Sequence, residues 1–426
     1  MKKVFFMILI VVAAAFGKDY TLKECVDIAL KNNLNLMKSK LDKRLAELDL
    51  KSVKSSFLGI RGAYDGEIFF SKSKFSNFDD NLNDYNYTDS DDFTNRLSLS
   101  ITANLSLPLI DRYKSSSLGI EYAENNLESV RDNLIYSVTT SFYNCILARE
   151  DINVQKENIK YNQTQYDETK LRYDLGSLTK SELLQAEVNL STARLNIINS
   201  EKRYEIVVQN LINLLNIDES YKQFNPVYEI PQKVTIENLD LEKLIEIGLK
   251  NRIDVKNAEL SLEQNSLLYD IEFDGIFPSV SASFNNSYST SNDKETQSLD
   301  HILSATLNWD LTFEDFNRMD KQKVSLKKSE LSYKQIISNA KNEITKTYLE
   351  LIQQKENLDR VGKHVELAKE NLDLANEMFR FGNKTITDRI KAMNDYIQSK
   401  YREIQARYEY ITSLAKLRNS INIDSF

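Results

Sequence analysis

The stretch Leu-Ser-Leu-Ser-Ile-Thr-Ala-Asn-Leu-Ser-Leu-Pro-Leu, residues 97–109, alternates apolar and polar side chains almost without error. Successive side chains of a β-strand point to opposite faces, so a period of two predicts a strand with one apolar and one polar face. Three further stretches share the pattern, the first of them more roughly: 60–70, 279–288 and 303–311. Strands of about ten residues with this alternation are typical of a membrane β-barrel wall, with lipid outside and water inside.

The first 17 residues have the pattern of a signal peptide. Lys2 and Lys3 precede an apolar run that ends at Phe16, and the small Gly17 precedes the expected cut. The run is too short for a membrane anchor, so we expect the chain to be exported. A buried N-terminal helix is the alternative interpretation.

The composition excludes several classes of function. The 426-residue chain has a formal net charge of −8, which argues against a nucleic-acid partner, because phosphate binding needs a basic face. Its two histidines and two cysteines form no ligand cluster, so we expect no metal and no cofactor. The sequence contains no nucleophile elbow, phosphate loop, dinucleotide fingerprint or His-Glu-x-x-His motif, so we expect no enzyme. Cys25 and Cys145 are expected as buried thiols, although a disulfide is possible.

The chain overlays itself. Residues 30–32, Leu-Lys-Asn, recur at 249–251, a shift of 219. The shift falls to 202 after the first predicted strand, where Leu105 matches Leu307, and is 206 near the end, where Gly176 matches Gly382. Self-similarity of this length predicts a tandem structural repeat.

Each copy has the same predicted order: helix, two strands, a very long helix, a glycine-containing turn and a long helix. The first repeat covers 18–217 with a β-hairpin at 60–109, and the second covers 239–426 with a hairpin at 279–311. Residues 218–238 form the linker between them. The acidic segment 71–95 and its counterpart 290–300 are expected to be solvated loops at the hairpin ends. Calcium binding by the acidic segment is an alternative, but the spacing of a calcium loop is missing.

Long helices dominate the rest of the chain. Residues 111–175 contain no proline, and as one helix they would span roughly 95 Å at about 1.5 Å per residue. From Leu183 onward, apolar residues recur in heptads, and a second such seam begins at Ile386. These seams predict coiled coils, since helices this long exceed a compact domain.

Four strands cannot close a membrane barrel. An open strand edge in lipid leaves backbone groups unpaired, at a cost of several kcal/mol each. Closed membrane barrels begin at about eight strands, so two or three copies of the chain are the small solutions.

The layout resembles the TolC family of outer-membrane efflux and secretion channels over essentially the whole mature chain. The resemblance rests on the opening 21–33, on 105–109 and 277–280 at the strand ends, and most specifically on 172–186. It implies a mainly α fold, namely a long coiled-coil α-helical barrel plus a 12-stranded transmembrane β-barrel shared by three protomers. It also implies an equatorial collar that includes the 218–238 linker, and it places the chain in the outer membrane, with its helices in the periplasm.

The resemblance implies a passive exit duct for efflux or type I secretion. Its implied partners are a periplasmic adaptor (membrane fusion) protein, an inner-membrane pump of RND or ABC type and outer-membrane lipid, and the implied assembly is a homotrimer. The cargo, whether drug, protein or metal, stays open. An exported coiled-coil structural or adhesive protein without a pore is the alternative.

The resemblance also implies a periplasmic gate at the two helix turns. Glu182 and Lys384 match positions where the family ties neighbouring turns together, and Asp388 matches an acidic ring position. Phe379 stands where a tyrosine is typical, so one hydroxyl is missing, and Lys391 replaces a second acidic residue. Ordinary solvated charges are the alternative interpretation.

The turns themselves are implied to contact the adaptor. The residues concerned are Gly176 and Ser177 in the first repeat, and Gly382 and Asn383 in the second.

Overall fold

The computed structural model describes residues 18–79, 84–227, 240–291, 297–381 and 383–423. The predicted signal peptide, most of the linker from residue 228 onward, and Gly382 lie outside the described residues. The chain forms two compact units. Unit 1 comprises Met1–Lys40, Asn125–Lys256 and Gln335–Phe426, and unit 2 comprises Leu41–Glu124 and Asn257–Lys334. We describe each unit by itself.

The elements of the first repeat recur in the second in the same order, with closely matched helices but shorter strands. In the first they are α1 (Leu22–Asn32), α2 (Leu34–Phe57), β2 (Leu58–Asp79), β3 (Asp84–Leu105), α3 (Leu107–Asp174) and α4 (Lys180–Leu215). In the second they are α5 (Leu241–Asn251), α6 (Ile253–Asp274), β5 (Ser279–Ser291), β6 (Gln297–Asn308), α7 (Phe313–Arg380) and α8 (Ile386–Ile421). Helices α3 and α7 each have 68 residues, and α4 and α8 each have 36. The predicted fold class, mainly α with long helices, a small β domain and an internal repeat, is therefore confirmed. None of the helices within the described ranges is both long and apolar enough to cross a membrane.

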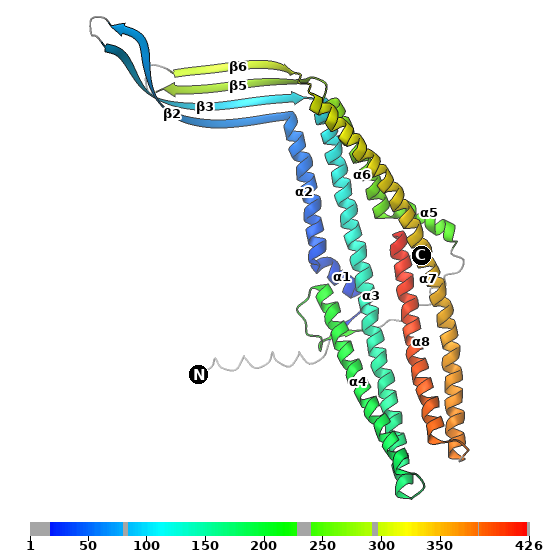
Figure 1. Ribbon diagram of the computed structural model, residues 1–426. Coiled ribbons are helices and arrows are strands. Elements are labelled where there is room, and N and C mark those ends of the chain that lie inside the picture. The colour runs from blue at the N-terminus through cyan, green and yellow to red at the C-terminus, as the bar shows by residue number, and fades with distance from the viewer. Residues whose placement is uncertain (1–17, 80–83, 228–239, 292–296, 382, 424–426) are drawn as a thin grey trace, which may run out of the picture. The chain divides into compact units, whose positions relative to one another are not determined.

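Unit 2 contains one antiparallel sheet with the strand order β2-β3-β5-β6 (Figure 1). Residues paired directly across an antiparallel ladder share a face of the sheet. The register aligns apolar residues from all four strands in rows, such as Ile60, Ile101, Phe284 and Leu303, or Tyr64, Leu97, Tyr288 and Leu299. Seven of these eight side chains are exposed, and Ile101 is half-buried. One face of the sheet thus carries exposed apolar side chains from all four strands, although the row of Leu99, Asn286 and His301 on the same face includes two polar residues.

The strands of the first hairpin are longer than predicted, and the expected loop at 71–95 is wrong for the residues described there. Strand β2 continues to Asp79 and β3 begins at Asp84, with one irregularity between Lys74 and Phe78. The shorter counterpart, 290–300, likewise contains the ends of β5 and β6. The ladder is held by backbone hydrogen bonds, which polar residues make as well as apolar ones, so composition alone misplaced the strand ends.

The strand predicted through residue 109 also ends too late. Strand β3 stops at Leu105 and α3 starts at Leu107, so Pro108 lies in the first turn of a helix rather than at a strand end. Proline is tolerated there because its missing N–H would have no partner within the first turn. In the second copy β6 ends at Asn308, so the predicted strand residues 309–311 lie between β6 and α7.

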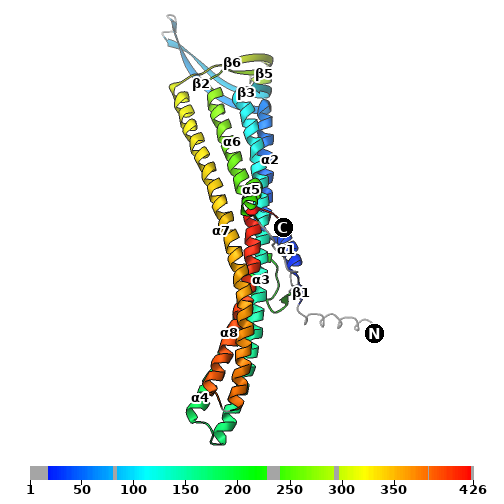
Figure 2. The same cartoon turned by 90° about the vertical axis from the view of Figure 1, so that its right-hand side faces the viewer.

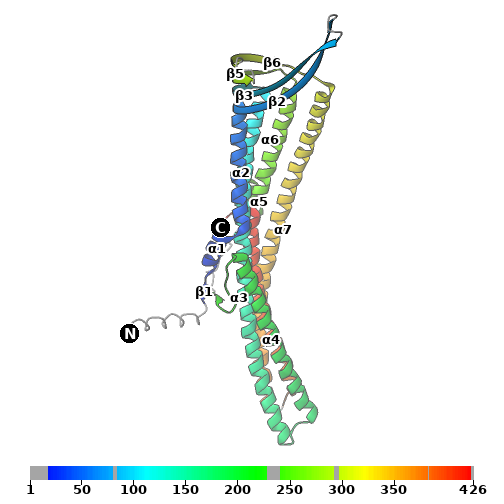
Figure 3. The same cartoon turned by 90° about the vertical axis from the view of Figure 1, so that its left-hand side faces the viewer.

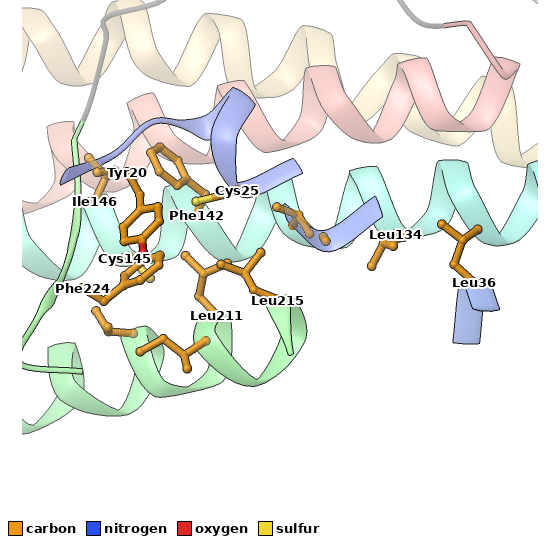
Figure 4. Packing of buried hydrophobic residues seen from close by; sticks show 14 residues of the cluster. Tyr20, Cys25, Leu36, Leu134, Phe142, Cys145, Ile146, Leu211, Leu215 and Phe224 are labelled. Carbon is orange, nitrogen blue, oxygen red and sulfur yellow. The ribbon is translucent and has the colours of Figure 1, made fainter. Parts of the chain in front are cut away.

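Two of the buried cores of unit 1 occupy equivalent places in the repeat. Buried residues from α1, α3 and α4 form one core, and those from α5, α7 and α8 form the other. Cys25, Val138, Cys145, Val208, Leu211 and Leu215 correspond in order to Leu244, Ile344, Leu351, Leu414, Leu417 and Ile421. Figure 4 shows the first core, where the Tyr20 ring stacks on Phe224 with centroids 4.3 Å apart.

The two cysteines fill apolar slots of this core. Both are free and buried, and burial raises the pKa of each thiol to about 12. Their equivalents in the second core are Leu244 and Leu351, which are also buried. The sites are therefore hydrophobic packing positions that a thiol fits as a small apolar side chain.

Short strands fasten the start of unit 1. Strand β1 (Lys18–Tyr20) pairs in parallel with β4 (Phe224–Pro226), and the Arg149 guanidinium donates to the Pro226 carbonyl at 2.7 Å. The Tyr20 hydroxyl donates to Glu219 at 2.6 Å. The described part of the linker therefore packs against the N-terminal segment.

Gly248 and Ile344 compensate each other in volume. A Cβ added to Gly248 would lie 2.4 Å from Ile344 Cδ1, a contact that real Cβ atoms do not make. The equivalent pair in the first core is Ala29 and Val138. Alanine is larger than the glycine it matches, and valine is smaller than the isoleucine it matches. Relative to the first core, the second core therefore has one carbon fewer at Gly248 and one carbon more at Ile344.

We expect Gly248→Ala to lower the free energy of unfolding by about 1–3 kcal/mol through overpacking. Adding Ile344→Val should recover part of that loss, because the double variant recreates the pair of the first core. Thermal unfolding followed by circular dichroism measures both. Losses that simply add would show that the two side chains do not compensate.

Candidate functional site

The two helix turns that the sequence singled out lie at the same end of unit 1. Helices α3 and α4 form one antiparallel pair, and α7 and α8 form the other, as Figures 2 and 3 both show. Both turns are short, since α4 starts at Lys180 after α3 ends at Asp174, and α8 starts at Ile386 after α7 ends at Arg380.

Gly176 is needed by the geometry of the first turn. Its φ is +76°, in the left-handed region that favours glycine. Its N–H donates to the Tyr173 carbonyl at 2.8 Å, and the N–H of Ser177 donates to the Arg172 carbonyl at 2.9 Å. This pair of bonds closes the C-terminus of α3 as a Schellman motif. In the second turn the N–H of Asn383 makes the equivalent bond, to the Met378 carbonyl at 2.9 Å.

Two of the predicted gate residues close the following helices. Glu182 accepts hydrogen bonds from the N–H and the hydroxyl of Thr179, at 2.7 and 2.9 Å. Asp388 accepts the same two bonds from Thr385, at 3.1 and 2.7 Å. Each threonine hydroxyl in turn accepts from the backbone N–H of the acidic residue. Both carboxylates therefore complete capping boxes, which satisfy N–H groups that the first helical turn leaves unpaired.

The capping bonds also lower the pKa of both carboxyl groups. The pKa of Asp388 is lowered mainly by the hydroxyl and backbone N–H of Thr385, with smaller contributions from Lys384 and Lys391. The pKa of Glu182 is lowered by the same two groups of Thr179, the backbone N–H first. Both acids are therefore negatively charged at neutral pH.

The expected tie between Glu182 and Lys384 is not formed within the described part of one chain. Lys384 is half-buried and close enough to Asp388 to lower its pKa. The tie therefore stays a proposal for a contact between neighbouring copies, as does the acidic ring at Asp388.

Phe379, the fourth predicted gate residue, is buried at this end of unit 1. Its side chain is 7% exposed, and two guanidinium groups lie over its ring. Arg172 Cζ of α3 is 4.4 Å from the ring centroid, and Arg389 Cζ of α8 is 5.1 Å from it. A cation over an aromatic face is attracted by the partial negative charge of the π electrons. The Phe379 ring therefore joins α7 to α3 and α8.

Arg389 is the best-connected side chain of this end of unit 1. Its Nε donates to the Tyr161 hydroxyl at 3.2 Å and to Asn376 Oδ1 at 2.9 Å, and one terminal nitrogen lies 2.5 Å from Glu168 Oε2. Burial disfavours its charge, but the bonds to Glu168 and Tyr161 outweigh that cost and raise the pKa of the guanidinium. The residue thus joins α8 to α3 and α7 at once.

Sequence reasoning missed Arg389, although a signal for it exists. The shift of 206 pairs Arg389 with Leu183, one of the heptad seam positions. A charged residue where the other repeat carries a seam leucine indicates a polar contact inside a coiled coil.

The side chains at these turns can bind ions and can hold neighbouring helices together through charged contacts. The described residues include no group of three or more His, Cys, Asp or Glu side chains placed to hold a metal ion. The turns present carboxylates, ammonium groups and guanidinium groups, which can attract ions and hold helices together.

Replacing both Glu182 and Lys384 by alanine should raise the single-channel conductance in a planar bilayer, because the tie between neighbouring turns is lost. Thr179→Ala is the matched control, since it removes the same cap while keeping the carboxylate. An equal rise in the control would assign the effect to helix capping, and the tie would be wrong.

Cation selectivity should persist on acidification until the pH falls below about 3.8, the ordinary pKa of aspartate, because the pKa of Asp388 is lowered. The stability that the capping Asp388 carboxylate gives to α8 is present above that pH, and it is lost as the pH falls through the lowered pKa. Reversal potentials in a salt gradient measure the selectivity. Asp388→Asn should weaken selectivity at every pH, and Thr385→Ala should move its loss to higher pH. Loss near neutral pH in the unmodified protein would mean that repulsion between copies dominates.

The chain matches the outer membrane efflux protein family over residues 26–216 and 244–422, one segment in each repeat. It is 25% identical over 270 residues to an uncharacterized protein of Haemophilus influenzae, covering 62% of this chain. It is 23% identical over 279 residues to toxin and drug export protein A of Aggregatibacter actinomycetemcomitans, covering 63% of this chain. In both cases the match spans 59% of the length of the relative.

The fold is similar to that of solved channels. The CmeC outer membrane channel of Campylobacter jejuni superimposes with a TM-score of 0.79 at 19% identity, covering 94% of this chain and 85% of that one.

Proposed function

Because this chain belongs to the outer membrane efflux protein family, we propose that it is the outer-membrane exit duct of a tripartite efflux or type I secretion system. The duct conducts its cargo passively and catalyses no reaction, since the energy comes from an inner-membrane pump. The family is one of the outer membrane, and the long helices of the chain lie in the periplasm.

The four-stranded sheet is the observation that carries this proposal. One face of the sheet holds exposed apolar side chains from every strand, among them Tyr64, Leu97, Phe284 and Leu303. Trp309 and Tyr288, residue types favoured at membrane interfaces, are also exposed. An apolar face of this kind is stable against lipid and costly in water.

The two edges of the sheet favour assembly with further copies. Strands β2 and β6 each have a neighbour on one side only. Edge groups cannot remain unpaired in lipid, so β6 of one copy pairs with β2 of the next. Three copies give a closed barrel of 12 strands.

Exposed helix faces favour the same assembly. Tyr161 and Glu168 of α3 are covered by α8 of the same chain. The repeat shift of 206 places Leu367 and Leu374 of α7 at the equivalent positions, yet these are 65% and 49% exposed. Helix α4 of a second copy is the occupant, since it presents its own exposed apolar residues: Leu184, Val188, Leu195 and Ile198.

The proposed partners are a periplasmic adaptor protein and an inner-membrane pump of RND or ABC type. The turns around Gly176 and Asn383 are the proposed adaptor contacts, because they are exposed at one end of unit 1 and closed by backbone bonds. A rigid turn lets an adaptor helix pack against the ends of two helices at little entropic cost.

The purified protein in detergent should have three times the mass of one chain and should form channels of small, cation-selective conductance in a planar bilayer. Light scattering gives the mass on the sample used for conductance. A monomer or dimer that never inserts would contradict the duct and favour the exported coiled-coil protein without a pore.

A further inference from the structure

We propose that β6 of one copy pairs with β2 of the next copy in one specific register, in which Ser304 lies directly opposite Asp65. The partner at this edge is a second copy of the chain. The inference rests on the proposed function, because it specifies how the open sheet closes into the barrel of the duct.

The strands within one chain define a row that runs straight across the sheet. Gly59 of β2 lies opposite Thr102 of β3. The row continues from Thr102 to Ser283 of β5 and ends at Ser304 of β6. The hydroxyl oxygens of Ser283 and Ser304 are 2.7 Å apart. The residue at which this row meets β2 of the next copy fixes the register between copies.

The bounds of β2 limit where the row can continue. Residues paired directly across a ladder share a face, so the row steps along β2 by an even number of residues from Gly59. With no step, or a step toward the N-terminus, Asn308 at the end of β6 would fall opposite α2, which ends at Phe57. The step is therefore toward Asp79, the other end of β2.

Closure of the barrel leaves two steps. Three copies repeat the step three times, and the sum is the shear of the 12-stranded barrel. With strands about 4.8 Å apart and a rise of about 3.4 Å per residue, a step of four residues tilts the strands by about 35°, and a step of six by about 47°. Steps of two or eight give about 20° or about 55°, far from the range of about 35–45° typical of membrane barrels.

Side-chain volume on the apolar face distinguishes the two steps. A step of six sets a large residue of one strand against a small residue of the other at three successive positions: Leu307 with Gly62, Ala305 with Tyr64, and Leu303 with Gly66. A step of four sets Ala305 against Gly62, which leaves a gap, and crowds Leu303 against Tyr64. Bulky side chains that cover glycines of a neighbouring strand pin the register of a sheet, and gaps in packing are costly.

The two edge strands have the exposure that this pairing needs. A Cβ built on Gly62 has no atom within 4 Å, so the space beside this glycine is open in one chain. Leu303 is 81% exposed and Leu307 is 68% exposed, and both belong to the edge strand β6. A step of six covers these two leucines with the glycine positions of β2.

Charge on the polar face favours the same step. A step of four sets Asp300 opposite Glu67, and two like charges directly across a ladder destabilise it. A step of six sets Asp300 opposite Phe69, which carries no charge. It also sets Ser304 opposite Asp65, where a hydroxyl can donate a hydrogen bond to a carboxylate.

The register sets the width of the duct at the barrel. At a fixed number of strands, a steeper tilt makes a barrel wider. The step of six gives a backbone radius of about 14 Å, against about 11 Å for the step of four. The size of cargo that can pass the barrel therefore depends on which residues of β2 meet β6.

Disulfide cross-linking between copies tests the register. Ser304→Cys is combined with Asp65→Cys, with Ala63→Cys or with Glu67→Cys, the positions opposite Ser304 at steps of six, four and eight. Oxidation by copper phenanthroline should link the first pair into covalent trimers about ten-fold faster than either other pair, because a disulfide needs Cα atoms about 4.4–6.8 Å apart. Non-reducing gel electrophoresis measures the linked fraction over time.

The four single-cysteine variants are the controls. They should not cross-link, because the native thiols of Cys25 and Cys145 are buried. Mass in detergent and single-channel conductance show that each variant still assembles.

Gly62→Leu gives a second, independent measurement. At a step of six it adds a bulky side chain against Leu307, so it should lower the temperature at which the trimer dissociates in detergent. Adding Leu307→Ala should restore that temperature. At a step of four, the new side chain would instead fill the space beside Ala305 and raise the temperature of dissociation.

Faster linking at Ala63 or Glu67, or a stabilising Gly62→Leu, would overturn the register. A trimer that links at none of the three pairs would also overturn it, because β6 and β2 would not be in this contact. If the unmodified protein formed no trimer and no channel, the register would fall together with the proposed duct. A trimer linked through another pair overturns the register alone.

Discussion

Backbone hydrogen bonds at the two edges of the sheet are the constraint on which the rest of the structure depends. Strands β2 and β6 each have one edge whose N–H and C=O groups have no neighbouring strand among the described residues. Facing lipid, such groups must find partners in other copies, because no water is present to bind them. The exposed apolar faces of α4 and α7 are consistent with that assembly, since they too need a second copy to cover them. In the proposed duct, a single chain therefore supplies only part of a closed barrel.

The internal duplication explains why one chain contains two structurally equivalent halves. The cores around Leu211 and Leu417 use matching positions, and differences between them are local and compensated, as with Ala29 and Val138 against Gly248 and Ile344. Because packing constrains volume more than identity, the two copies keep their backbone while their side chains diverge. The cysteines are one product of that freedom, since leucines occupy the same slots in the other copy.

The copies differ most in character at the tip. Both turns use the same capping box, which indicates that this acidic residue is first of all a helix-closing residue. The matching positions differ, however, since Arg389 makes polar contacts with α3 and α7, whereas Leu183 is a buried apolar side chain. A repeat that is symmetric in backbone can thus be asymmetric in the type of its side-chain contacts.

Pattern alone determined the class of this protein: period-two strands, heptad helices, the repeat and the residues of both turns were readable because local periodicity reflects which face is buried. The strand ends near Asp79 and Asp84 were not, since ladder bonds are made by backbone groups that composition does not reveal. Nor could periodicity show that Phe379 is buried between Arg172 and Arg389, or that Arg389 reaches Glu168. The Arg172–Phe379 and Glu168–Arg389 contacts join residues more than 200 positions apart, and only tertiary packing decides which distant side chains meet.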